Sequence, residues 1–237
     1  MGVKLHQPCR PISIAHSDEG SLLEIENSVT QEHSSLQYTA LLIAAGAWSS
    51  IVTSTLFPTA PSTTRNEITA LAGHALVLRS PHWPPPALDP TDTTSAKSDC
   101  HAVFTTEAEG GYSPEIFSRM PNGEVYLAGL NSSTYPLPKV ANERVIDPAA
   151  IAVLKKTARR LCGQDVEIMR ESVCWRPVTR KGTPIIRELS DVSKSGGSKV
   201  FLAAGHGAWG ISLSMGTGYC VAGMVQGKDM SEFVGRL

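Results

Sequence analysis

Two segments of the chain end in the same small residues, and each could bring backbone groups close to a large ligand. The apolar runs that end at residues 44–46 and 203–205 both finish in Ala-Ala-Gly, and each is followed by an Ala-Trp pair. Ligands of parallel α/β sheets bind beyond the carboxyl ends of strands, where small residues let the backbone approach a cofactor. Tight packing between strand and loop would explain one such end, whereas two in one chain favour a shared cofactor.

The loop after the second run adds a candidate proton-exchanging group, His206, within Gly-His-Gly-Ala-Trp-Gly at residues 205–210. We expect a helix to begin near residues 216–218, and its exposed N–H groups would favour a phosphate or the N1/C2=O edge of a reduced flavin. Ile211 and Leu213 would pack on an apolar ring. A histidine between glycines is more often a turn or packing residue, so a base and a structural role both stay open for His206.

His-Gly-Ala-Trp after a strand is also typical of the oxyanion loop of α/β-hydrolases. That fold requires a G-x-S-x-G nucleophile elbow, followed by an acid and a histidine. The chain contains no G-x-S-x-G, and the short tail after residue 210 contains no histidine. The hydrolase interpretation is therefore the weaker one.

The elements that must position these residues alternate in type along the chain. We expect strands at residues 4–14 and 22–25, and a strand buried on both faces at 38–45, as in a parallel sheet. The Thr/Ser/Pro-rich stretch 53–64 predicts a crossover between domains, and residues 80–99 predict an exposed loop. Strands at 72–79, 101–106, 115–120 and 124–130, with a turn at 121–123, predict an antiparallel sheet.

Local signals also define the helices and the last strand. Asp147 as N-cap, Pro148 at the first position and Gly163 as the stop predict one helix. Residues 166–186 are expected to be extended, residues 200–204 to form a second buried strand, and residues 215–225 to form the final helix. The segment 200–218 is thus expected to be a strand, a glycine-rich turn and a helix start.

Composition excludes several classes of protein. The net charge of −1 provides no electrostatic footprint for nucleic acid, and no apolar run approaches the roughly 18 residues of a membrane span. The five cysteines are scattered without a C-x-x-C pair, and the histidines form no metal-binding spacing, so we expect no protein metal site. The start lacks the long apolar core of a signal peptide, and the expected location is cytoplasmic.

Three motifs occur in an order typical of one enzyme family. They are Ala-Ala-Gly-Ala-Trp-Ser at 44–49, Cys-x-Arg-Pro-x-Thr-x-x-Gly-x-Pro-Ile-Ile at 174–186, and Gly-His-Gly-x-Trp-Gly-Ile-Ser at 205–212. Over nearly the whole chain, the sequence resembles the FAD-dependent oxidoreductases of the D-amino-acid-oxidase type, and among them a fungal group. The piece Gly-Glu-Val-Tyr-Leu-Ala-Gly-Leu-Asn at 123–131 is similar to the substrate-domain sheet of that group.

The resemblance implies a mixed α/β fold with three parts. Residues 1–56 and 171–237 would form a partial GR2-type FAD-binding domain, and residues 57–170 an antiparallel substrate-binding domain. FAD would be the cofactor, and hydride would pass to it from a C–N bond of an amine or amino acid. The residues implied to bind the cofactor are Pro11, Ala45, Gly46, Trp48, Gly207, Ala208, Trp209, Gly210, Ile211 and Ser212. Arg176, at the family's Arg-Pro position, is the implied catalytic residue that would grip a substrate carboxylate, and pairing with an acid at the sheet edge explains it equally well. His206, from the loop, is the second catalytic candidate.

Two departures from the family pattern bear on activity. The one G-x-G-x-x-G of the chain is the loop at residues 205–210, and none lies near the start, where the family has it. The first βαβ unit with its pyrophosphate cradle is therefore expected to be absent, as in an N-terminally truncated chain. Arg180 stands where many relatives carry Asp, and Cys174 is expected to be a buried thiol rather than a flavin attachment point. The alternative function is that of a non-catalytic remnant which acts as an interaction module.

Overall fold

The computed structural model describes residues 2–17, 20–65, 67–83, 101–106, 111–119, 123–193 and 198–234. The chain forms two compact units, one of residues 1–70 and 176–237 and the other of residues 71–175. The functional division of the chain into FAD-binding and substrate-binding parts stays a prediction. The sequence prediction of an exposed loop at 80–99 falls mostly on residues 84–100, outside the described residues, as does most of the turn at 121–123.

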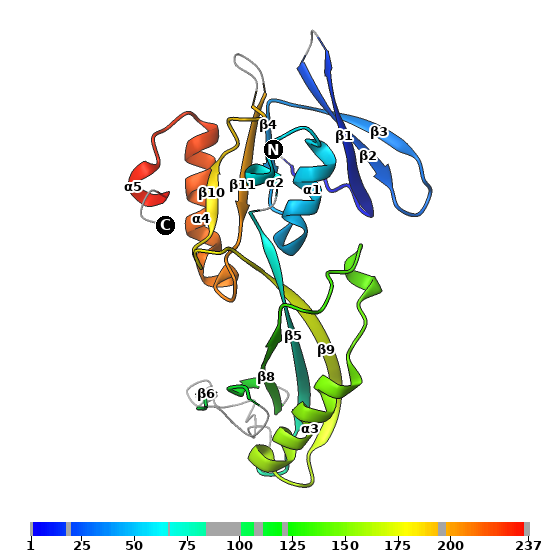
Figure 1. Ribbon diagram of the computed structural model, residues 1–237, viewed down its shortest axis with the longest axis vertical. Coiled ribbons are helices and arrows are strands. Elements are labelled where there is room, and N and C mark those ends of the chain that lie inside the picture. Colours follow the sequence, from blue (N-terminus) through cyan, green and yellow to red (C-terminus); the bar gives the residue numbers. More distant parts are fainter. Residues whose placement is uncertain are drawn as a thin grey trace, which may run out of the picture. The chain divides into compact units, whose positions relative to one another are not determined.

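A three-stranded sheet with the order β10-β11-β4 forms the centre of the first unit (Figure 1). Its strands are β4 (Ala40–Ile43), β10 (Ile185–Glu188) and β11 (Lys199–Ala204). β11 runs parallel to β4, with Lys199 opposite Ala40 and Leu202 opposite Ile43, and antiparallel to β10. Both Ala-Ala-Gly runs thus follow strands, as predicted, and the structure shows that these strands are parallel neighbours in one sheet.

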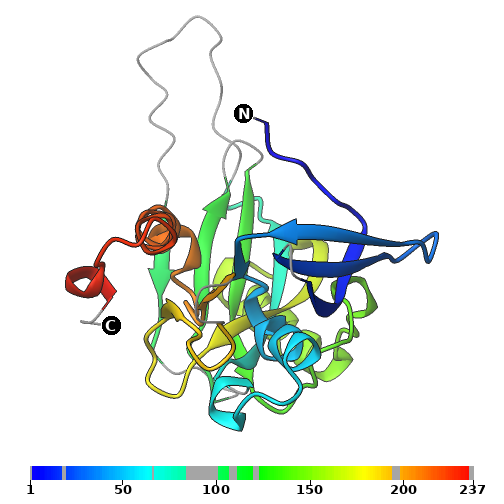
Figure 2. The same ribbon diagram turned by 90° about the horizontal axis from the view of Figure 1, so that it is seen from above.

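Helices cover both faces of this sheet. On one face, α4 (Gly210–Val225) packs Cys220 and Val221 against Ile186 and Ala203. On the other face lies α1 (Ser49–Leu56), followed by α2 (Ser62–Arg65), and the short α5 (Ser231–Val234) ends the described chain. Figure 2 shows α4 on one side of the sheet and α1 on the other. None of the helices in the described ranges is long and apolar enough to cross a bilayer.

A second sheet of the first unit is an antiparallel meander of β1 (Cys9–Ser17), β2 (Gly20–Asn27) and β3 (His33–Tyr38). The first two strands confirm the predicted pair, although both are shifted or longer. The third strand was not predicted because its sequence, His-Ser-Ser-Leu-Gln-Tyr, is polar. Strands of an antiparallel sheet with one solvated face tolerate such a sequence.

Three expectations for the first unit were wrong in detail. β4 is the edge strand of its sheet rather than a strand buried on both faces, and its Leu42 remains 42% exposed. The predicted crossover at 53–64 contains the end of α1 and most of α2, and the Thr53 hydroxyl is satisfied within α1 by the Ser49 carbonyl, 2.8 Å away. Helix α4 begins at Gly210 instead of near residues 216–218.

The second unit is a five-stranded sheet with the order β6-β7-β8-β5-β9 and one long helix. The strands are β5 (Thr69–Arg79), β6 (Ala102–Phe104), β7 (Glu115–Arg119), β8 (Glu124–Ser132) and β9 (Glu167–Val178). The β5–β8, β6–β7 and β7–β8 pairs are antiparallel, as predicted.

Helix α3 (Pro148–Cys162) covers the core of this second sheet. Its start matches the prediction, since the Asp147 carboxylate accepts a hydrogen bond from the Ala149 N–H at 2.9 Å. It ends at Gly163, whose φ of +111° is accessible to glycine, and Leu154 on its inner face is fully buried. Capping chemistry and the apolar stripe therefore specify this helix locally.

Candidate functional site

The candidate site lies where the parallel strands β4 and β11 end. Because the strands are neighbours and parallel, their carboxyl ends reach the same edge of the sheet. β4 leads through the 3-10 turn Gly46–Trp48 into α1, and β11 leads through residues 205–209 into α4. Both helices have a tryptophan, Trp48 or Trp209, as N-cap and no side-chain cap hydrogen bond.

Uncapped helix starts carry free N–H donors and a partial positive charge. The first turns of α1 and α4 contain no acidic side chain that would neutralise this charge. Gly210, Ile211 and Ser212 form the first turn of α4, and Ile211 is 92% exposed. Two such ends at one sheet edge suit an anionic or electron-rich group.

Glycines make both connections possible, and both have open space beside them. Gly46 and Gly207 have φ values of +55° and +58°, which side chains rarely adopt. A Cβ on Gly46 would meet nothing within 4 Å, and one on Gly207 only the Val178 Cγ1 at 4.0 Å. Both therefore face open space into which a ligand could approach the backbone.

The loop after β11 is fastened to the end of β9. The Gly207 N–H donates to the Pro177 carbonyl over 2.7 Å, which links this loop to the residue after Arg176. Arg176 is half-buried on β9. It lines neither of the two cavities described below.

His206 has a defined partner that sequence reasoning missed. Its Nε2 lies 2.9 Å from the Thr217 Oγ1, two turns into α4. Burial lowers the pKa of His206 below its ordinary value, so the imidazole is neutral near pH 7. The expectation that the helix begins near residues 216–218 would place Thr217 at the helix start. It therefore gave no reason to expect Thr217 beside His206.

Two cavities flank the end of β4, one on each face of the sheet. The first, of about 400 Å³ on the α1 face, is lined in part by Pro11, Leu41, Ala44 and Ala45. The second, of about 550 Å³ on the α4 face, is lined by residues that include Ala44, His206 and Gly210. Predicted site residues thus meet in two groups that share Ala44, whereas Trp209 and Ile211 are exposed.

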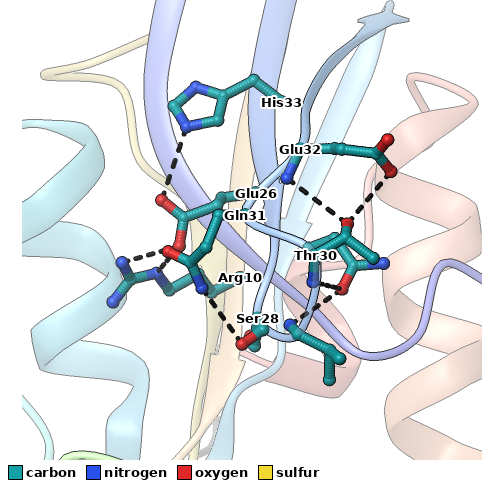
Figure 3. A network of polar contacts seen from close by, with 9 residues as sticks. Arg10, Glu26, Ser28, Thr30, Gln31, Glu32 and His33 are labelled. Carbon is teal, nitrogen blue, oxygen red and sulfur yellow. Dashed lines mark hydrogen bonds and ion pairs between the residues drawn. The ribbon is translucent and has the colours of Figure 1, made fainter.

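Pro11 is held in place by a β-bulge and a charged cluster. The register of β1 against β2 shifts between Pro11 and Ser13, a position that tolerates a residue without an N–H. Beside it, the buried Glu26 carboxylate accepts a hydrogen bond from the Arg10 Nε at 2.9 Å. The His33 Nε2 lies 3.5 Å from the other oxygen of the same carboxylate (Figure 3). This cluster ties the three strands of the meander together.

Ser49 is a second residue to which sequence reasoning assigned no role. It is the first residue of α1, directly after Trp48, and only 1% exposed. Its Oγ is buried and has no hydrogen-bond partner among the described residues. An unpaired buried hydroxyl costs about 1–3 kcal/mol, which fits a polar partner that the described chain does not supply.

Cys174 does not behave as expected from the sequence. It is exposed rather than buried, and its Sγ lies 3.8 Å from the Gly73 carbonyl oxygen. Its side chain alternates outward on β9 while the neighbouring Val173 is buried. Among the described residues, no His, Cys, Asp and Glu side chains group as a metal site would require.

Comparison with known proteins identifies the family. A family model described as "FAD dependent oxidoreductase" (DAO) matches residues 1–224, nearly the whole chain. The chain belongs to this family. The resemblance inferred from the three motifs is thereby confirmed, and FAD is the cofactor of the family, as predicted.

Individual relatives of the chain are distant. The Schizosaccharomyces pombe protein C1F5.03c, whose name assigns it provisionally to the oxidoreductases, is 25% identical over 197 residues, which are 81% of this chain and 43% of that protein. Membership of a narrower fungal group stays a prediction.

Solved structures share the fold. Glycine oxidase from Geobacillus kaustophilus matches with a TM-score of 0.66 and 21% identity over 96% of this chain and 50% of its own. Fructosyl peptide oxidase from E. terrenum matches with a TM-score of 0.63 and 15% identity, over 95% and 50%. The chain therefore spans about half the length of the proteins that it matches.

Proposed function

We propose that the carboxyl ends of β4 and β11 bind the ring side of FAD, and that the protein serves the oxidation of a C–N bond in an amine or amino acid. The observation that carries the proposal is the pair of uncapped helix starts at one sheet edge, next to Gly46 and Gly207 with open space beside them. The site fits a flavin in shape and charge. Small residues allow close approach of the backbone to the ring.

A bound flavin would accept a hydride from the substrate carbon that carries the nitrogen. The N–H groups at the start of α4 would favour negative charge at the neighbouring ring edge, and a helix terminus contributes about 0.3–1 kcal/mol to such an interaction at an exposed site. Arg176 would bind a substrate carboxylate. His206, neutral and hydrogen-bonded to Thr217, would accept a hydrogen bond or a proton rather than act as a cation.

Relatives support the substrate class. Solved structures similar to this chain include enzymes named glycine oxidase, iminodiacetate oxidase and fructosyl peptide oxidase. Glycine, iminodiacetate and fructosyl peptides all carry an amine nitrogen bonded to carbon. Family membership also speaks against the hydrolase interpretation of the Gly-His-Gly-Ala-Trp loop.

Flavin binding tests the proposal directly. Purified protein is titrated with FAD and, separately, with riboflavin, and binding is followed by the change in flavin absorbance and fluorescence. We expect both ligands to bind, since the proposed site contacts the ring. If neither flavin binds, the proposal is wrong, and the alternative of a non-catalytic interaction module gains support.

A matched pair of variants locates the site. Ile211→Glu places a carboxylate in the first turn of α4, where it would compete for the free N–H groups, and Met215→Glu places the same charge one turn further on. Both side chains are exposed, at 92% and 85%, so both variants should fold. We expect Ile211→Glu to weaken flavin binding about fivefold, consistent with about 1 kcal/mol, and Met215→Glu to change it less than twofold. Equal effects would contradict a site at the helix start.

A further inference from the structure

A third cavity lies within the second unit, apart from the proposed flavin site. Its volume is about 490 Å³, and its described lining residues all belong to residues 71–175, among them Trp83, Val103 and Cys162. The two cavities beside β4 are lined by residues of the other unit. A ligand in the third cavity would therefore bind independently of a flavin.

The antiparallel sheet provides one wall of this cavity. Val103 of β6 lies opposite Ile116 of β7, and Ser118 of β7 lies opposite Val125 of β8. Because alternate residues of a strand share a face, all four side chains line the face of the sheet that α3 covers. The last turn of α3 lines the cavity as well, so the cavity continues the apolar core of the unit.

The turn after β5 provides a second wall, and several contacts fasten it. The Trp83 N–H donates to the Ser80 carbonyl over 3.0 Å, and the Ser80 Oγ donates to the Cys162 carbonyl at the end of α3. On the outer side of the turn, the His82 Nε2 lies 3.4 Å from the Asp165 Oδ1. The wall is thus built by the fold itself and holds the Trp83 side chain in place.

The indole N–H of Trp83 is a donor that the described residues leave unused. Its Nε1 is buried and has no hydrogen-bond partner among them. The indole packs edge-on against the ring of His101, with 5.0 Å between the ring centroids, and both rings line the cavity. The hydroxyls of Ser80 and Thr105, by contrast, already donate to backbone carbonyls. Buried donors normally have a partner, so this N–H calls for an acceptor.

We propose that this cavity binds a planar, largely apolar small molecule of about two fused rings, which accepts a hydrogen bond from the Trp83 indole N–H. An apolar cavity of about 150 Å³ accommodates benzene, and this one is about three times as large. Mostly apolar walls with a few polar groups are typical of small-molecule sites of this volume. The rings of Trp83 and His101 favour an aromatic ligand through edge and face contacts.

Quinoline and indole are matched probes of this site. The ring nitrogen of quinoline accepts a hydrogen bond, whereas the ring N–H of indole only donates one. In ¹H–¹⁵N spectra of the full chain, each of the four tryptophans contributes one indole N–H signal, and Trp83→Phe assigns the signal of Trp83. We expect quinoline to shift this signal saturably and to bind about three- to tenfold more tightly than indole, the ratio that one neutral hydrogen bond provides.

Neighbouring residues of β6 provide the variants that locate the site. Val103→Phe adds a ring to the cavity wall and should weaken quinoline binding at least fivefold. Ala102→Phe is the matched control, because Ala102 points to the opposite face of the strand and does not line the cavity. Both residues are exposed, so both variants should fold, and the control should change binding less than twofold. Trp83→Phe should reduce the preference for quinoline over indole to less than twofold.

Three results would overturn the proposal. The first is a Trp83 signal that about 10 mM quinoline leaves in place, since even weak ligands of this size bind in the millimolar range. The second is equal binding of quinoline and indole to the unaltered chain. The third is an equal effect of Val103→Phe and Ala102→Phe, which would place the probe elsewhere. These measurements need no flavin, so they can fail while the flavin titration succeeds, and the reverse.

Discussion

Replacement of Gly205 by alanine tests how tightly the chain turns after β11. Gly205 is buried and has a φ of +89°. An added Cβ would lie 2.5 Å from the Thr179 Cγ2 and 3.1 Å from the Ile68 Cδ1, both too close for an undisturbed contact. Gly207, two residues on, provides the matched control, since its φ is +58° but an added Cβ would meet only the Val178 Cγ1 at 4.0 Å.

The expected magnitudes follow from these distances. A left-handed backbone conformation costs an alanine about 1–2 kcal/mol, and this applies to both positions. Overpacking adds about 1–3 kcal/mol at Gly205 alone. Gly205→Ala should therefore lower the free energy of unfolding by about 2–5 kcal/mol and Gly207→Ala by about 1–2 kcal/mol. The larger loss is a substantial fraction of the 5–15 kcal/mol typical of a folded domain.

Urea unfolding of the two single variants and of their combinations with Thr179→Ser separates strain from overpacking. Serine removes the clashing Cγ2 but keeps the hydroxyl, which donates to the Thr183 carbonyl at 2.7 Å. We expect Thr179→Ser to restore about 1–3 kcal/mol in the Gly205→Ala background and nothing in the Gly207→Ala background. The reasoning is refuted if both glycine variants lose the same stability, or if Thr179→Ser restores none.

Three further predictions concern the second unit, each measured by urea or thermal unfolding. Leu154→Ala, in the fully buried core, should cost about 2–5 kcal/mol, and a loss below 1 kcal/mol would contradict the packing of α3. Tyr112→Phe removes the 2.7 Å hydrogen bond from the Tyr112 hydroxyl to the Thr157 Oγ1 and should cost about 1 kcal/mol; an unchanged stability would contradict that bond. Burial lowers the pKa of His74 below its ordinary 6.5, and its Nε2 accepts the Asp147 N–H at 3.1 Å, so the folded state binds fewer protons and stability should fall as the pH drops below 6.5. His74→Gln should make that decline shallower between pH 6.5 and 5, and an unchanged slope would refute the assignment.

Elements with complete local signals were predicted well. Asp147, Pro148 and Gly163 bracket α3, and the two Ala-Ala-Gly runs became neighbouring parallel strands. The predictions failed where tertiary structure decides. Thr53 lies in a Thr/Ser/Pro-rich stretch that predicts a crossover, yet α1 includes it, buried and with its hydroxyl bonded to the Ser49 carbonyl.

In the candidate site, too, the sequence could not predict the contacts that tertiary structure decides. The sequence indicated which loops follow the strands, but the contacts of His206 depend on where α4 begins. Gly216 and Gly218 suggested a late start, whereas the helix begins at Gly210 and continues through both glycines. Helix propensity disfavours such glycines by about 1 kcal/mol each, so the packing of the helix on the sheet must outweigh it. That register places Thr217 beside His206, which no local pattern could reveal.

The wrong expectation for β4 is informative in itself. An apolar run at residues 38–45 predicts a strand covered on both faces, but the described structure leaves it at an edge with Leu42 exposed. The apolar sequence is typical of a strand that other polypeptide covers. Among the described residues, however, β4 lies at the edge of its sheet, and they cover it only in part.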